Sequence, residues 1–122
     1  MKCLILIIFF MVGCGQSYNS NSPDSRAYAD LPAIADPGLI PAFIVINQKC
    51  ISCHTGYHSS WYNYTANVNW VNSGLAVSGS PSQSQIYKYL AGVTGSISDM
   101  PKGETPLSQS EIDTLVTWIN GI

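Results

Sequence analysis

The chain has 122 residues, enough for one small domain with an extension, and 46% of them are hydrophobic while only 10% are charged. The formal charge of −2 argues against the basic surface that nucleic-acid binding requires, so no nucleic-acid partner is expected. Four cysteines, at positions 3, 14, 50 and 53, are the first residues whose chemistry has to be explained.

The first thirteen residues have the features of an export signal. Leu4 to Val12 form an apolar run. This run is shorter than the roughly 20 residues that a membrane-spanning helix needs, and it suits the core of a secretory signal. The run ends in Met11-Val12-Gly13-Cys14, which resembles a bacterial lipobox. The resemblance implies a lipoprotein signal peptide over residues 1–13 and a lipid on Cys14.

Lipidation of Cys14 predicts where the protein works. Two or more acyl chains hold a protein stably on a membrane surface. We therefore expect an exported protein, anchored to a bacterial membrane on its periplasmic or outer-surface side. The alternative is an ordinary signal cleaved elsewhere, for which Ala27-Tyr28-Ala29 is a distant candidate.

Residues 14–37 are predicted to be a flexible tether between the lipid and a folded domain. They are rich in Ser, Asn, Asp, Pro and Ala and show no apolar period. Asp36-Pro37-Gly38 ends the tether as a turn. The remaining residues, 38–122, form one compact domain, which is small enough to need a stabilising group besides its own core.

The first half of this domain contains two predicted helices. The first covers residues 39–49, where Leu39, Phe43 and Ile46 recur at helical spacing. The second is short and is expected to be capped by Thr65.

Two capping boxes predict the other helices. Ser80 and Gln83 begin a third helix that ends at Gly92, and Ser108 and Glu111 begin a fourth that ends near the chain terminus. No convincing strand alternation occurs. The sequence therefore predicts an all-α domain of about four short helices.

The string Cys50-Ile51-Ser52-Cys53-His54 is the most specific motif in the chain. Residues three apart face the same way on a helical turn, so two thiols can bond the two vinyl groups on one edge of a haem. The histidine that follows can then be the proximal ligand of the haem iron. The C-x-x-C-H pattern indicates one covalently attached haem c.

Other interpretations of the motif explain fewer of its residues. A thioredoxin-like redox pair requires a surrounding βαβ pattern, which is missing. A structural zinc site requires four ligands, and the candidates Cys50, Cys53, His54 and His58 are crowded together with no distant second pair. A disulfide between the two cysteines is compatible with export but leaves His54 unexplained.

Met100 is the candidate for the second, distal iron ligand. Of the three methionines, the other two lie in the leader, and Met100 stands in a loop before the fourth helix, followed by Pro101. A thioether opposite histidine raises the reduction potential of a haem. The alternative for Met100 is simple core packing. His58 is a rival ligand, but on a continued helix it would lie on the same side as His54, so we interpret it as a surface residue.

Together these residues resemble the small cytochrome c domain family over residues 38–122. The matching features are Phe43 in a helix leading into the C-x-x-C-H motif, the Met100-Pro101 loop, and Trp118 in the last helix. The resemblance implies that the first and last helices pack beside the haem, with Phe43 and Trp118 as candidates for an aromatic contact. Other aromatic residues are expected partly to line the haem pocket: Tyr57, Trp61, Tyr62, Tyr64 and Trp70.

The function expected from these features is electron transfer between a redox donor and an acceptor protein, both unidentified, by a single-haem carrier that is not an enzyme. The domain has only three lysines, which departs from the lysine-ringed docking face of mitochondrial carriers. One alternative is a haem enzyme or gas sensor with a displaceable distal ligand, but the only arginine lies in the tether. Another is a haem-containing accessory subunit of a larger respiratory complex.

Overall fold

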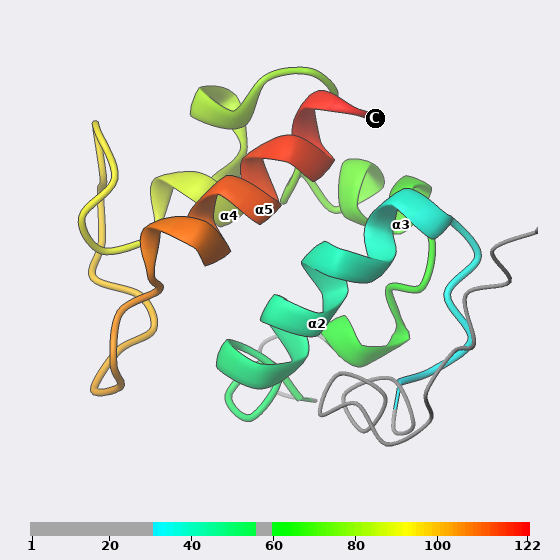
Figure 1. Cartoon of the computed structure of the whole chain (residues 1–122), viewed down its shortest axis with the longest axis horizontal. Helices are drawn as coiled ribbons and strands as arrows, with labels where there is room; N and C mark the ends of the chain where they lie inside the picture. The colour runs from blue at the N-terminus through cyan, green and yellow to red at the C-terminus, as the bar shows by residue number, and fades with distance from the viewer. Residues whose placement is uncertain (1–30, 56–59) are drawn as a thin grey trace, which may run out of the picture.

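The computed structural model describes residues 31–55 and 60–122, which form a small all-α fold (Figure 1). Within these ranges there are four α-helices and three 3-10 turns but no β-strand, which confirms the predicted all-α class. None of the described helices is long and apolar enough to span a membrane. In chain order the elements are η1 (Pro37–Leu39), α2 (Ile40–Lys49), η2 (Trp61–Asn63), α3 (Asn67–Asn72), η3 (Pro81–Gln83), α4 (Gln85–Lys88) and α5 (Gln109–Asn120).

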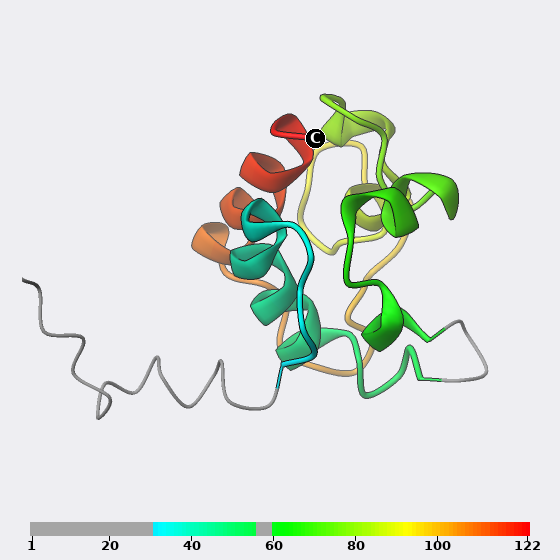
Figure 2. The same ribbon diagram turned by 90° about the vertical axis from the view of Figure 1, so that its right-hand side faces the viewer.

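Helices α2 and α5, far apart in the sequence, pack against each other and form one side of the domain (Figures 1 and 2). Figure 2 shows the segment from η2 to the loop after α4 on the other side of this pair. The packing of the first helix on the last, which the cytochrome resemblance implied, is therefore present. It places the end of α2, where the C-x-x-C-H motif follows, next to the start of α5.

The two helices meet through apolar side chains. Each buries one face, as the spacing of its apolar residues predicted, and burial of one such side chain stabilises the fold by roughly 1.5–3 kcal/mol. Trp70, from α3, is also fully buried and completes this core. The buried residues of the pair are Ala42, Phe43, Val45 and Ile46 in α2 and Ile112, Leu115, Trp118 and Ile119 in α5.

The predicted capping box of the last helix is confirmed. The backbone N–H of Glu111 donates to the Ser108 hydroxyl at 3.3 Å, and the Ser108 N–H donates to the Glu111 carboxylate at 2.7 Å. Gly121 ends the helix, as expected. Local sequence thus determines both ends of α5, because each end is closed by residues within one turn of it.

The start of α3 differs from the prediction. The residue before the helix is Ala66, and Thr65 does not cap it. Instead, the Asp36 carboxylate accepts a hydrogen bond from the Asn67 N–H at 2.7 Å. The carbonyl of Thr65 accepts one from the Ala35 N–H at 2.8 Å. A carboxylate from an earlier part of the chain therefore satisfies the N-terminus of α3, and the segment around Asp36 is tied to the domain.

The predicted third helix is divided in two. Ser84 separates η3 from α4 with an extended backbone, ψ 128°, and its side chain is fully buried. Its hydroxyl accepts from the Val77 N–H at 2.8 Å and lies 3.0 Å from the Ser80 carbonyl, to which it donates. No side-chain cap forms at Ser80. The serine hydroxyl competes with the helical hydrogen-bond pattern, which is why the continuous helix does not form.

The aromatic contact expected between Phe43 and Trp118 is replaced by other pairs. The Trp118 ring lies edge-on to Trp70, with ring centroids 5.6 Å apart, and Phe43 has its ring contact with Tyr62 at 6.5 Å. Trp118 also donates from Nε1 to the Asn67 side chain at 2.8 Å. Phe43 and Trp118 are both buried in the core, but the ring of Trp70 in α3 lies beside Trp118 and is its ring partner.

Candidate functional site

One cavity of about 340 Å³ brings together four residues that the sequence singled out. Cys50, Cys53 and His54 line it from the turn after α2, and Met100 lines it from the loop before α5. Apolar side chains from the segment between them complete the wall, together with a few polar and charged groups at the rim. These further lining residues are Trp61, Leu75, Ile86, Tyr89, Leu90 and Pro101, with Lys49, Gln85, Lys102 and Glu104.

The C-x-x-C-H motif folds as a tight turn. Helix α2 ends at Lys49, and the Cys50 N–H still donates to the Ile46 carbonyl at 2.8 Å. The Cys50 carbonyl then accepts from both the Cys53 N–H at 3.1 Å and the His54 N–H at 3.0 Å. This one carbonyl therefore holds the second cysteine and the histidine close to the end of the helix.

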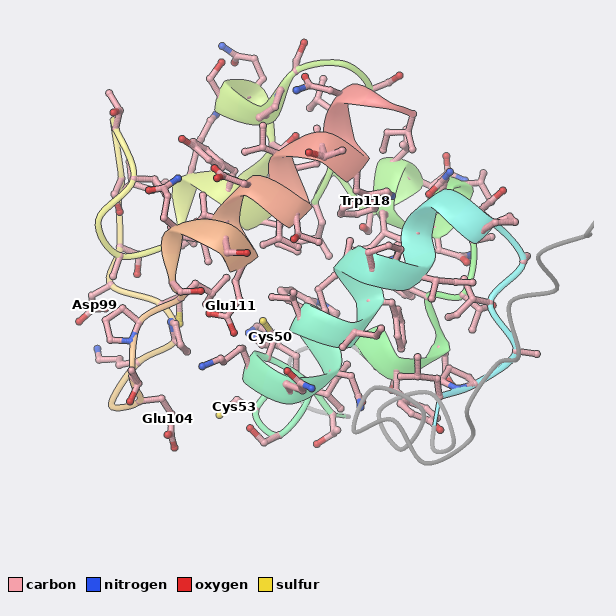
Figure 3. All side chains as sticks on the ribbon, viewed as in Figure 1. Cys50, Cys53, Asp99, Glu104, Glu111 and Trp118 are labelled. Carbon is pink, nitrogen blue, oxygen red and sulfur yellow. The ribbon has the colours of Figure 1, made fainter. Side chains whose placement is uncertain are left out.

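The two thiols do not face the same way, in contrast to the prediction for a helical turn. Cys50 is half-buried and Cys53 is exposed. In Figure 3 the Cys50 side chain lies toward α5 and the Cys53 side chain lies at the outer end of the turn. In this structure they are therefore not arranged as a pair of thioether anchors, although both line the cavity. The reason is that α2 ends before the motif.

Burial also changes the chemistry of the first thiol. The pKa of the Cys50 thiol is raised to about 12, mainly by desolvation and also by the neighbouring Cys53, while Lys49 opposes the rise. The side chain is therefore a neutral thiol at neutral pH. Thiol–disulfide exchange requires a thiolate, which cysteines of thioredoxin-like pairs obtain through a lowered pKa. Cys50 therefore lacks the lowered pKa of an attacking thiol.

His54 is in contact with Trp61, a residue that the sequence analysis named only as one of five aromatic candidates. The two rings are nearly parallel, with centroids 3.8 Å apart and an interplanar angle of 14°. The Trp61 N–H also donates to the His54 carbonyl at 3.2 Å. Nothing in the sequence distinguished Trp61 from the other aromatic residues, because no motif fixes its distance from the histidine.

Met100 is held through its backbone. Its N–H donates to the Tyr89 carbonyl and its carbonyl accepts from the Ala91 N–H, both at 2.9 Å, so that Leu90 and Met100 form an isolated parallel bridge. Within the loop between Leu90 and Met100, the Ser96 hydroxyl donates a hydrogen bond to the Leu90 carbonyl at 2.6 Å. These bonds fix the place from which the half-buried Met100 side chain lines the cavity.

An ion pair joins the rim of the cavity to α5. Lys49 Nζ lies 3.6 Å from the Glu111 carboxylate. Partial burial opposes ionisation of Glu111, but hydrogen bonds from Ser108 and the Lys49 ammonium outweigh this effect and hold the pKa of the carboxyl below its usual value. The residue before the C-x-x-C-H motif is thereby tied to the capping box of the last helix.

The predicted lipidation site Cys14 and the rival ligand His58 lie outside the described residues, as does Tyr57. In residues 31–55 and 60–122, no group of three or more His, Cys, Asp or Glu side chains is arranged to hold a metal ion by itself.

Comparison of the chain with protein-family profiles, with curated proteins and with solved structures finds no match.

Proposed function

We propose that this chain is a single-haem c-type cytochrome that passes electrons between two redox proteins at a membrane surface. The observation that carries the proposal is the shared cavity, in which the C-x-x-C-H residues meet Met100 from a separate loop. Its volume of about 340 Å³ lies in the range of ligand pockets. Two thiols, an imidazole and a thioether are the donor set of a covalent haem with His/Met ligation.

The residues that line the cavity would have three roles: they would attach the haem, bind its iron and exclude water. Cys50 and Cys53 would hold the haem covalently, and His54 and Met100 would be the axial ligands. When bound, the haem supplies reversible one-electron redox chemistry. The apolar wall beside Met100, including Leu90, which is 3% exposed, keeps water from the site, and such a wall raises the potential of a buried redox group. Because His54 and Met100 would both hold the iron and leave no place on it for a substrate, the proposed role is that of a carrier and not of an enzyme.

The different settings of the two cysteines are compatible with attachment. Cys53 is exposed and lies on a turn, so its side chain can rotate toward the cavity without displacing core residues. Cys50 already lies half-buried at the cavity wall. One exposed side chain therefore has to change its orientation, while the turn that carries both thiols keeps its hydrogen bonds.

We also propose that residues 1–13 are a lipoprotein signal, that Cys14 carries the lipid, and that residues 14–37 are the tether, whose last part is bonded to the domain at Ala35 and Asp36. The support is the lipobox-like Met11-Val12-Gly13-Cys14. Attachment of haem to C-x-x-C-H motifs takes place outside the bacterial cytoplasm, so export and haem attachment agree. Cys14→Ala should release the protein from the membrane fraction while leaving the haem attached, and mass spectrometry of the wild type should find acyl chains on residue 14.

The proposal is tested with the full chain, expressed in a host that attaches haem c. Mass spectrometry should find one haem on the peptide containing Cys50 and Cys53, and ferric protein should show the weak far-red charge-transfer band of Met–His ligation. Met100→Ala should abolish the band, and Ile97→Ala, which changes a 64% exposed residue of the same loop, should keep it. Absence of haem from the wild type contradicts the proposed function, and a band that survives Met100→Ala contradicts the ligand assignment.

A further inference from the structure

Trp61 contacts His54 in two independent ways. Its indole ring stacks on the imidazole at 3.8 Å with an interplanar angle of 14°, and its backbone N–H donates to the His54 carbonyl at 3.2 Å. Trp61 is also 8% exposed and lines the cavity. One buried residue thus fixes both the main chain and the ring plane of the candidate iron ligand.

Trp61 is itself held by the core. Its ring lies edge-on to Trp70, with centroids 5.5 Å apart, and Trp70 is fully buried. Trp70 donates from Nε1 to the Tyr64 carbonyl at 2.8 Å and lies edge-on to Trp118 of α5 at 5.6 Å. A residue orients its neighbour effectively when its own rotamer is locked by packing and hydrogen bonds. Trp61 meets this condition because the rings behind it are locked in this way.

The stack is compatible with metal ligation by the same imidazole. A parallel indole covers one face of the ring, whereas a metal bonds an imidazole nitrogen in the plane of the ring. The residues that orient a ligating histidine control its ring plane and through it the properties of the metal. Stacked aromatic rings attract each other beyond the burial of their area, so the stack favours one orientation of the imidazole over others.

We infer that Trp61 is the positioning residue that sets the imidazole plane of His54. The inference rests on the proposed function for its effect on a haem, whereas the stack itself belongs to the protein with or without one. Loss of the indole removes the surface against which the imidazole is aligned. The imidazole of His54 can then rotate, although the backbone hydrogen bond from residue 61 to the His54 carbonyl is kept.

The first test uses the full chain with haem attached and compares Trp61→Leu, Trp61→Phe and the control Trp118→Leu. Trp118 is another buried indole, but its ring partner is Trp70 and not His54. The g-values of the ferric protein in electron paramagnetic resonance depend on the orientation of the axial imidazole. We expect Trp61→Leu to shift and broaden them, and Trp61→Phe, which keeps a stacking ring, to stay close to wild type. Trp118→Leu removes a ring that touches Trp70 but not His54, so it should shift the values much less than Trp61→Leu.

The second test uses the full chain expressed without haem attachment, so that it does not depend on the proposed function. The indole ring current should move the ring-proton resonances of His54 upfield in the wild type. This shift should be reduced in Trp61→Phe, lost in Trp61→Leu and largely kept in Trp118→Leu, which leaves the indole of Trp61 in place. Trp61→Phe decides the test if the leucine variant does not fold. Wild-type His54 resonances without an upfield shift, or resonances unchanged in a folded Trp61 variant, overturn the inference. Absence of haem from the wild type overturns only the proposed function.

Discussion

Leu90 and Met100 lie side by side in a parallel bridge that closes the loop between α4 and the site. The bridge depends on main-chain bonds at 2.9 Å from Met100 to Tyr89 and from Ala91 to Met100. Because these bonds involve backbone groups, the position of Met100 does not depend on its own side chain. A methionine ligand placed in this way would be available before any cofactor is attached.

The stability of this loop is expected to depend on Ser96. Its hydroxyl donates to the Leu90 carbonyl at 2.6 Å, inside the loop that the bridge closes. Ser96→Ala should lower the free energy of unfolding by about 1 kcal/mol, the net contribution of one hydrogen bond, and should speed hydrogen exchange at the Ala91 amide. Urea unfolding and exchange measured by NMR check both effects. Thr94→Ala, an exposed change in the same loop, is the control, and equal exchange in both variants contradicts the role of Ser96.

The pairing of Glu111 predicts a loss of stability in acid. The folded-state pKa of Glu111 lies below its usual value, which is about 4.3 in an unfolded chain. The stabilisation is therefore complete above that value and is lost as the pH falls through the folded pKa. Urea midpoints measured from pH 6 to pH 2 should fall less steeply below about pH 4.3 in Glu111→Gln than in the wild type. Glu104→Gln, at an exposed position, should keep the wild-type profile.

The parts of the fold that sequence predicted are those closed by neighbouring residues. The start of α5 depends on Ser108 and Glu111, three residues apart, and both hydrogen bonds of the capping box formed as expected. The apolar spacing of α2 likewise predicted its buried face. Sequence also named the cysteines, His54 and Met100 that the structure brings to one cavity, but their roles toward a haem remain predictions.

The parts that sequence missed depend on residues that are distant in the chain. The N-terminus of α3 is satisfied by Asp36. The ring partner of Trp118 comes from α3, and the stack on His54 comes from η2. Periodicity and capping patterns describe one segment at a time, so they contain no information about which ring will meet which. The different orientations of the two cysteines were missed because α2 ended before the motif.

Ser84 should be among the most sensitive small residues of the domain. It is fully buried, and its hydroxyl accepts from the Val77 N–H at 2.8 Å where the expected third helix divides. Ser84→Ala removes this bond and the one to the Ser80 carbonyl, so we expect a loss of about 1–3 kcal/mol in the free energy of unfolding. Chemical denaturation measures the change. The exposed Ser82→Ala in η3 should differ little from wild type, and an equally small effect at Ser84 contradicts the structural role assigned to its hydroxyl.

The two cysteines should differ in reactivity when no haem is attached. Burial raises the pKa of Cys50 to about 12, so at pH 8 only about one part in ten thousand of this thiol is thiolate. Alkylation of the reduced full chain with iodoacetamide, followed by peptide mass spectrometry, should label the exposed Cys53 first. Labelling of Cys50 should accelerate only as the pH rises toward 12.

Cys53→Ser provides the matched control, because it removes the neighbouring thiol that also raises the pKa of Cys50. Labelling of Cys50 in this variant should therefore accelerate at a somewhat lower pH but should remain slow at pH 8, since burial is the larger cause. Rapid labelling of Cys50 at pH 8 in the wild type would show a reactive thiolate instead. That result would favour a redox-active dithiol over an attachment site, because exchange chemistry requires the thiolate form.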